Sequence, residues 1–370
     1  MTETRTDPFS VVLEQATAIA ERLPRPALDA DEAESVDMMV ESVRAWAERN
    51  IDSAAIDEAA DVDPTVYQSA AELGLFGLTV PEPHGGAGFS LSAAARIIEE
   101  VATFDRSVAT SIGLHCGLGL RGLIHFGSAE LKERYLPSLA TGERIAAFAA
   151  TEPDAGSHIA GVKTVAKWDG NTGLMVNGSK CFVTNGAIAD VFTILAKTPG
   201  LGGARRGYSL LLMTKAMPGI DVGAEEHKLG IRGSSTTTLS FDDVEVDTSQ
   251  VIGEPSKGLD LMNEVLAWGR TLMSAGCLGS AREAYNRAAA YVLDRRQFGK
   301  PIGAFGLVRE KVATMRARLY ATESLVRLTT LLQSAYDSDI IWESSIAKVF
   351  ASESTWQITD DALQVHGGAG

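Results

Sequence analysis

The chain has 370 residues, of which 45% are hydrophobic and 22% are charged. This length is about two to three times that of an ordinary domain, and the apolar content can bury a sizeable core, which excludes a disordered chain and a disulfide-rich miniprotein. The 33 basic and 48 acidic side chains leave a formal net charge of −15. This charge argues against nucleic acid or an anionic membrane as the main partner, although a local basic patch could still bind a phosphorylated ligand.

The cysteines and the N-terminus bear on the cellular compartment. Cys116, Cys181 and Cys277 are too few and too scattered for a disulfide framework or a zinc site. Residues 1–34 contain no basic segment followed by an apolar core, so we expect no signal peptide. No run of about 18 apolar residues is present, which excludes a membrane-spanning helix. These features predict a soluble, cytoplasmic protein.

The first third of the chain reads as helices. Residues 1–34 carry few bulky apolar groups and are interpreted as an N-terminal extension. An N-terminal helical domain is predicted over residues 35–142, where Ser90 is suited to cap a helix. The apolar side chains that recur at helical spacing near its start are Met38, Met39, Val43 and Trp46.

The middle of the chain, residues 143–251, changes to short apolar runs separated by turn dipeptides. Asp169-Gly170, Asn177-Gly178 and Asn185-Gly186 favour the positive φ angles of tight hairpins. We therefore predict an antiparallel, β-barrel-like middle domain. No parallel sheet is expected, because helices and strands do not alternate along the chain.

Helical periodicity returns over residues 252–370, which predicts a C-terminal helical bundle. One stripe of this region contains Val308, Val312, Met315, Leu319 and Val326. The predicted fold class is accordingly α+β, with helices, then β structure, then helices.

Two patterns in the sequence do not indicate a binding site. Gly117, Gly119 and Gly122 spell GxGxxG, but a dinucleotide fingerprint needs a preceding strand. Helices surround this one, so close helix packing explains it better. The six histidines stand alone in the sequence, without the spacing of metal ligands, and we predict no metal site. No serine or cysteine has the context of a nucleophile, which leaves hydrolase chemistry without support.

Five segments are more specific. The first, Ala146–His158, is an apolar strand that enters a Pro/Gly/Ser turn, and its hydroxyls and free N–H groups suit a flat polar heterocycle. The others are residues 176–186, 228–236, 295–302 and 364–370. In this order and at these separations they resemble the acyl-CoA dehydrogenase family, from about Ser35 to Gly370. Residues 305–311 and 347–353, with Trp356, are most similar to its very-long-chain branch.

The resemblance implies FAD as the cofactor, bound between the middle domain and the C-terminal helices. One side of the flavin would be lined by Phe148, Ala150, Thr151, Gly156 and Ser157. The other side would be covered by Phe182, Val183 and Thr184. Arg295 would bind the pyrophosphate, and a segment reaching the flavin of a neighbouring subunit would comprise Gln364, Val365, His366, Gly367 and Gly368. Ser157 and Arg270 match positions that contact the coenzyme A part of the substrate.

The implied reaction is dehydrogenation of a fatty acyl-CoA of medium-to-long chain to the trans-2-enoyl thioester. A glutamate would take the α proton. Some family members place it immediately before the residue that matches Arg270, but that position is Gly269. Most place it about 25 residues beyond the Gly-Gly-x-Gly motif, which is past Gly370. We therefore assign no catalytic residue, expect the bundle to be C-terminally incomplete, and expect the chain alone to be inactive.

Two positions depart from the family pattern: His158 replaces an aspartate, and Ala267 replaces an Asp or Asn. The resemblance implies an electron-transfer flavoprotein or a similar acceptor as partner, and a homodimer or homotetramer. Two alternatives stay open. One is a flavin oxidase or monooxygenase on the same fold, and the other is a non-catalytic FAD- or CoA-binding subunit of a heteromeric enzyme.

Overall fold

The N-terminal part of the molecule is helical. The computed structural model describes residues 30–370, so most of the predicted extension lies outside the described residues. The helices are α2 (Ala30–Asn50), α3 (Ser53–Ala59), α4 (Pro64–Glu72), α5 (Leu91–Phe104), α6 (Arg106–Leu114), α7 (Leu120–Phe126) and α8 (Ala129–Ala140). The boundary predicted at residue 34 falls inside α2.

Local sequence explains where these helices begin. Ser90 caps α5 as predicted, since its hydroxyl accepts a hydrogen bond from the backbone N–H of Ala93 at 3.2 Å. The predicted apolar face of α2 is partly wrong, because the Met38 side chain is 57% exposed. The buried stripe of α2 instead comprises Val36, Val40, Val43 and Ala47, one residue per helical turn. Met38 lies two positions from this stripe and therefore points away from the core.

A π-helix, His115–Gly119 (η2), joins α6 to α7 and contains part of the GxGxxG pattern. A β-carbon on Gly119 would lie 2.9 Å from the Cβ of Ala146, and one on Gly117 would lie 3.0 Å from a methyl of Leu272. Both glycines therefore permit close packing, and a helix rather than a strand precedes them. This confirms the packing interpretation of the pattern.

The middle part is an eight-stranded sheet. Its strands are β1 (Ala146–Ala149), β2 (Val165–Trp168), β3 (Gly173–Thr184), β4 (Val191–Lys197), β5 (Tyr208–Thr214), β6 (Ile220–Val222), β7 (Thr236–Asp247) and β8 (Val251–Ile252). Hydrogen bonding follows the open path β6-β7-β3-β2-β4-β5-β8, with β1 beside β4. The boundary predicted after residue 251 falls inside β8.

Two details of the predicted sheet are wrong. β1 pairs with β4 in parallel, from Ala146 opposite Val191 to Ala149 opposite Ile194. A parallel pair arises because the connection from β1 to β4 contains β2 and β3 and is therefore no hairpin. Asn177-Gly178 is no turn either: it lies within β3, where a register shift occurs between Val176 and Gly178. Gly178 takes its positive φ of 142° in this bulge.

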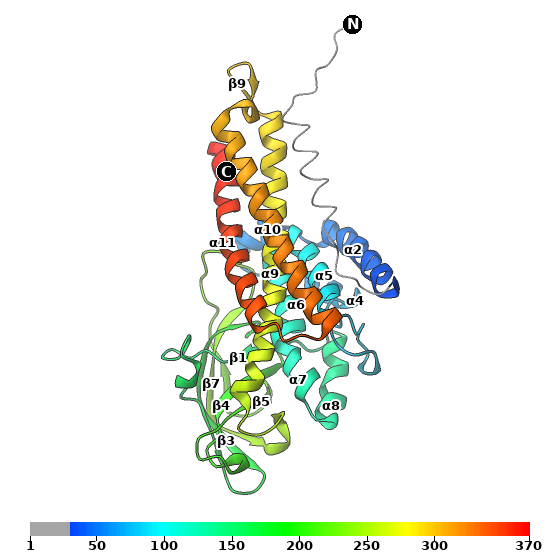
Figure 1. Ribbon diagram of the computed structural model, residues 1–370. Coiled ribbons are helices and arrows are strands. Elements are labelled where there is room, and N and C mark those ends of the chain that lie inside the picture. Colours follow the sequence, from blue (N-terminus) through cyan, green and yellow to red (C-terminus); the bar gives the residue numbers. More distant parts are fainter. Residues whose placement is uncertain (1–29) are drawn as a thin grey trace.

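The C-terminal part contains three long helices: α9 (Gly258–Asp294), α10 (Gly306–Tyr336) and α11 (Ile341–His366). The hairpin of β9 (Arg296–Gln297) and β10 (Lys300–Pro301) follows α9. Figure 1 shows α9 running from the sheet to the opposite end of an elongated molecule, where β9 lies. The predicted stripe of α10 is confirmed, because Val312, Met315, Leu319 and Val326 are buried.

The N-terminal and C-terminal helices share one hydrophobic core. Ile97 and Ile98 of α5 belong to the same buried cluster as Leu272 and Leu278 of α9. Two further clusters lie at the sheet. Cys116, Cys181 and Cys277 are buried free thiols. Within residues 30–370, every helix is too short or too polar to traverse a bilayer.

Candidate functional site

Two adjacent segments of the sheet, called the two walls below, form the candidate site. The first follows β1, and the second lies in β3, where the backbone N–H of Cys181 donates to the carbonyl of Thr151 at 3.0 Å. A register shift between Lys180 and Val183 accompanies a φ of 54° at Phe182. The Phe182 side chain is consequently 65% exposed between two buried neighbours. Positive φ at a non-glycine residue costs about 1–2 kcal/mol and is typical of functional sites.

A buried ion pair links the two walls. Lys180 is fully buried, and its Nζ donates to Glu152 Oε1 at 2.7 Å and to the carbonyl of Ala150 at 3.1 Å. Glu152 also accepts hydrogen bonds from the backbone N–H groups of Lys163 and Thr164, the latter at 3.0 Å. The carboxylate therefore closes the loop that contains Gly156 and Ser157.

Electrostatics favours a charged Glu152. Burial alone would raise the pKa of its carboxyl, but the bonds from Lys163 N–H, Lys180 and Thr164 outweigh burial and lower it. Burial lowers the pKa of Lys180, and the adjacent carboxylate opposes this. Sequence analysis named both residues within motifs but gave them no role. The available signal was a lysine between a largely apolar run and the apolar residues Cys181 to Val183 of the same strand.

The predicted flavin-lining residues of the two walls lie close together in the structure. Phe148 and Val183 are buried, whereas Gly156 and Ser157 are exposed. The hydroxyls of Thr151, Ser157 and Thr184 have no hydrogen-bond partner among residues 30–370. Free hydroxyls beside an exposed aromatic ring fit a flat heterocycle that has polar edges, as FAD does.

The remaining predicted cofactor residues lie at the other end of the molecule. The ring of Tyr291 stacks on that of His366, with centroids 4.3 Å apart. Arg295 is exposed one turn beyond Tyr291, and its guanidinium has no partner within the described chain. The segment Gln364–Gly368 therefore lies beside the Arg295 end of α9. Val365 is buried, but Gln364, Gly367 and Gly368 are exposed.

One chain does not bring these two groups together. Near the sheet, the π-helix that contacts Ala146 packs against Leu272 of α9. Arg295 lies 23 residues further along α9, which is about 35 Å at the rise of an α-helix. Figure 1 likewise shows β1 and β9 in opposite halves of the molecule. A single cofactor could contact both groups only if they came from two chains.

The close contact between the π-helix and α9 limits which side chain fits at position 269. A β-carbon on Gly269 would lie 2.2 Å from a methyl of Leu118. A glutamate at this position would displace Leu118. Arg270 follows on α9 and is half-buried, with no side-chain partner in residues 30–370. Ala267 is buried, and His158 is exposed.

A basic pocket of about 380 Å³ lies where β4 ends and β5 begins. Its charged lining comes from Lys197, Arg205 and Arg206. Tyr208, which also lines it, donates its hydroxyl to the carbonyl of Ala160 at 2.7 Å. The pocket therefore lies beside the loop that contains Ser157. Sequence analysis missed it, although two adjacent arginines in a chain of net charge −15 were a signal.

Comparison with known proteins gives a consistent result across the chain. The family model of the acyl-CoA dehydrogenase N-terminal domain matches residues 33–143, that of the middle domain residues 147–244, and that of the C-terminal domain residues 256–370. The very long-chain specific acyl-CoA dehydrogenase of Macaca fascicularis is 36% identical over 353 residues. That match covers 93% of this chain and 53% of the relative.

Two bacterial proteins extend the comparison. An acyl-CoA dehydrogenase of Bacillus subtilis is 36% identical over 337 residues, covering 90% of this chain and 88% of the relative. The crystal structure of an acyl-CoA dehydrogenase from Bacillus anthracis, complexed with FAD, has a TM-score of 0.83 and 32% identity. It covers 95% of this chain and 62% of that one. The fold and the site thus define an acyl-CoA dehydrogenase type of protein.

The chain belongs to the acyl-CoA dehydrogenase family. The three matched domains together span most of the sequence, which confirms the resemblance and the three-part fold. The chain spans about half the length of the very long-chain relatives that it matches.

Proposed function

We propose that the protein binds FAD and takes part in the α,β-dehydrogenation of fatty acyl-CoA thioesters to trans-2-enoyl-CoA. The observation that carries this proposal is the pair of walls at Thr151 and Phe182, with free hydroxyls beside an exposed aromatic ring. Family membership supplies the reaction class. Oxidase or monooxygenase chemistry on the same fold, and a non-catalytic subunit, remain the alternatives.

Each cofactor-facing residue has a chemical role in this proposal. FAD, when bound, supplies the acceptor for hydride from the β carbon of the substrate. Thr151 donates its hydroxyl to a polar edge of the ring system, and Phe182 covers an apolar face. Arg295 and Gln364–Gly368 would serve the cofactor site of a second copy, which agrees with the proposed homodimer or homotetramer. No residue between 30 and 370 is assigned as the proton-accepting base.

The proposed substrate class rests on a positively charged pocket and on the resemblance to one branch of the family. The pocket with Lys197, Arg205 and Arg206 suits the phosphates of coenzyme A, while Ser157 and Arg270 supply further donors. Resemblance to the very-long-chain branch favours medium-to-long straight acyl chains. The proposed electron acceptor is an electron-transfer flavoprotein or a similar protein, and the proposed location is the cytoplasm.

Cofactor binding is the first test. We expect the 370-residue chain, titrated with FAD, to become yellow and to release intact FAD on denaturation. Arg295→Ala should weaken FAD binding about tenfold, because it removes a charge-assisted bond to phosphate. The measurement is the dissociation constant from flavin fluorescence. A correctly folded protein that takes up no FAD contradicts the proposal.

A further inference from the structure

We propose that the buried Lys180–Glu152 pair is a positioning pair, which fixes the two walls of the flavin site relative to each other. This inference rests on the proposed function. Neither residue faces the site: Lys180 is fully buried and Glu152 is 5% exposed. Their effect on the cofactor is therefore indirect, through Thr151 and Phe182.

The positions of the two residues in the chain explain how they act on Thr151 and Phe182. Lys180 lies two residues before Phe182, at the start of the register shift in β3. Its ammonium bonds to the carbonyl of Ala150 and to the carboxylate of Glu152, the two residues that flank Thr151. One side chain thus fixes both neighbours of the predicted ring-binding hydroxyl. A change in its length or charge should move Thr151 relative to Phe182.

Glu152 extends the effect to the loop. Its carboxylate accepts from the backbone N–H groups of Lys163 and Thr164, so both ends of the loop meet at one side chain. The backbone of Glu152 also exchanges two hydrogen bonds with Ala155, at 2.9 and 3.0 Å. Gly156 and Ser157 follow immediately. The loop therefore has a fixed conformation before any ligand arrives, and such preorganisation reduces the entropic cost of binding.

The physics of buried ion pairs favours a positioning role over a stabilising one. Replacing such a pair with apolar side chains of similar volume is often neutral or stabilising. An apolar pair, however, would give no directional bonds to Ala150, Lys163 or Thr164. The strained φ of Phe182 also persists only where its surroundings fix it from several sides, and Lys180 is one of these constraints.

The test compares the pair with a matched exposed pair in the same loop. Lys180→Met and Glu152→Gln should each raise the dissociation constant for FAD about tenfold or more, since each removes a charge-assisted hydrogen bond. Lys163 and Asp154 form an exposed pair at 2.6 Å, with side chains 72% and 70% exposed. Lys163→Met and Asp154→Asn should change the constant by less than about twofold.

The double variant Glu152→Gln/Lys180→Met separates positioning from charge balance. It leaves no uncompensated buried charge, so we expect it to fold while FAD binding stays weak. Recovery of wild-type affinity in this variant would overturn the positioning role. Wild-type affinity in both single variants would overturn it as well.

Hydrogen exchange of the apoprotein gives a readout that needs no flavin. The N–H of Cys181 bonds to Thr151 and that of Ala155 bonds to Glu152, so both amides should exchange faster in the pair variants. Unchanged exchange at both amides would refute the positioning pair. If the wild-type chain binds no FAD, the proposed function fails, and the exchange data still decide on the pair.

Discussion

His115 is a single residue that joins the N-terminal helices to the sheet. It is fully buried in the π-helix, where Nδ1 accepts a hydrogen bond from the N–H of Ala146 at 2.9 Å. Its Nε2 lies 3.2 Å from the carbonyl of Leu139 and donates to it in the neutral ring. Burial lowers the pKa of His115 to about 4. The ring is therefore neutral at physiological pH.

This lowered pKa makes folding stability depend on pH. In the unfolded chain His115 titrates near 6.5, so between about pH 6.5 and 4 only the unfolded state takes up the proton. The neutral His115 ring makes its full contribution to the free energy of unfolding above pH 6.5. Up to about 3 kcal/mol of this free energy is lost as the pH falls to 4.

Replacement of His115 tests this account. In His115→Asn, the amide oxygen replaces Nδ1 as acceptor and the bond to Leu139 is lost. We expect a loss of about 1–3 kcal/mol at pH 8, from the unpaired carbonyl of Leu139. We also expect a flatter pH dependence between 6.5 and 4, measured by urea unfolding at each pH. A variant as steep as the wild type in this window would contradict the assignment.

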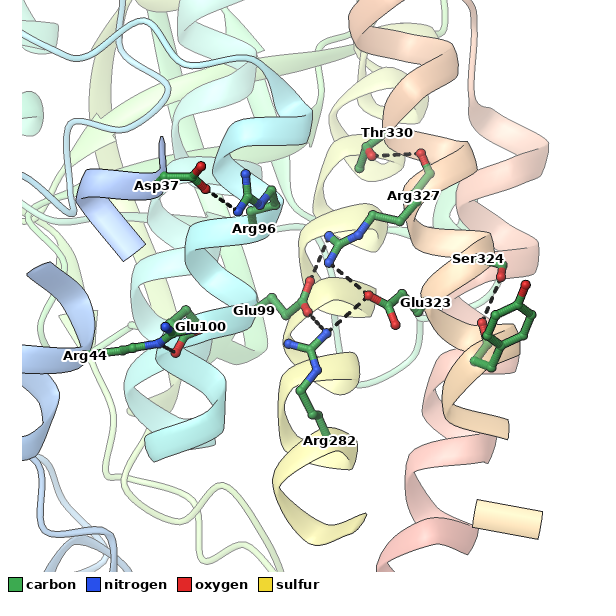
Figure 2. Close-up of polar contacts among 11 residues, drawn as sticks. Asp37, Arg44, Arg96, Glu99, Glu100, Arg282, Glu323, Ser324, Arg327 and Thr330 are labelled. Atoms are coloured by element: carbon green, nitrogen blue, oxygen red, sulfur yellow. Dashed lines mark hydrogen bonds and ion pairs between the residues drawn. The ribbon is translucent and has the colours of Figure 1, made fainter. Parts of the chain in front are cut away.

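At the scale of whole helices, a buried charge cluster fixes α5 against α9 and α10. Figure 2 shows Glu99 of α5 between the guanidinium groups of Arg282 and Arg327. Arg327 lies 2.9 Å from Glu99 Oε2, and Arg282 contacts Oε1. Glu323 lies 3.5 Å from Arg282 and 3.4 Å from Arg327. Burial alone would raise the pKa of Glu99, but the two arginines outweigh it and lower the pKa.

Glu99→Gln should therefore destabilise the fold by about 3–5 kcal/mol at pH 7, because it leaves two buried cations poorly compensated. The neighbouring Glu100→Gln is the matched control. Glu100 pairs at 2.6 Å with Arg44, whose side chain is 56% exposed, and its loss should cost about 1 kcal/mol. Urea unfolding measures the loss of unfolding free energy in both variants. The contribution of Glu99 to stability is complete above the ordinary carboxyl pKa of about 4.5 and is lost as the pH falls through its lowered pKa in the folded protein. Equal losses in the two variants would refute the cluster's role.

The sequence predicted local features of these elements better than long-range ones. Ser90 as a cap and Asn185 in a turn with a φ of 64° depend on nearby residues, and both follow from propensity. The π-helix, the parallel pairing of β1 with β4 and the partners of Glu99 depend on residues far apart in the chain. Arg282 lies well over 100 residues from Glu99, and no local pattern connects them.

In the candidate site, too, the sequence predicted local features better than long-range ones. Motif resemblance named Thr151 and Phe182, and the structure places them on adjacent segments that are joined by a backbone hydrogen bond. It named Arg295 as well, but only the length of α9 reveals that this residue lies at the opposite end of the molecule. The role of Lys180 could not be predicted, because its two partners become visible only once β1 and β3 are adjacent.

The separation of the two residue groups leads to a prediction for the whole molecule. If one flavin site combines the Phe182 wall of one chain with Arg295 of another, two different defects should complement each other. Phe182→Ala and Arg295→Ala should each bind FAD weakly as homo-oligomers, because every site contains one defect. In a mixed dimer, one site carries both defects and the other carries neither.

The experiment refolds the two variants together in equal amounts and titrates the mixture with FAD. Random pairing makes about half of the dimers mixed, so about a quarter of all sites should regain wild-type affinity. The control is the same titration on each variant alone, and on the two mixed after folding without exchange. Phe182 is largely exposed, so its truncation should leave the fold intact. If the co-refolded mixture contains mixed dimers and yet shows no high-affinity sites, Arg295 and Phe182 do not share a cofactor across two chains.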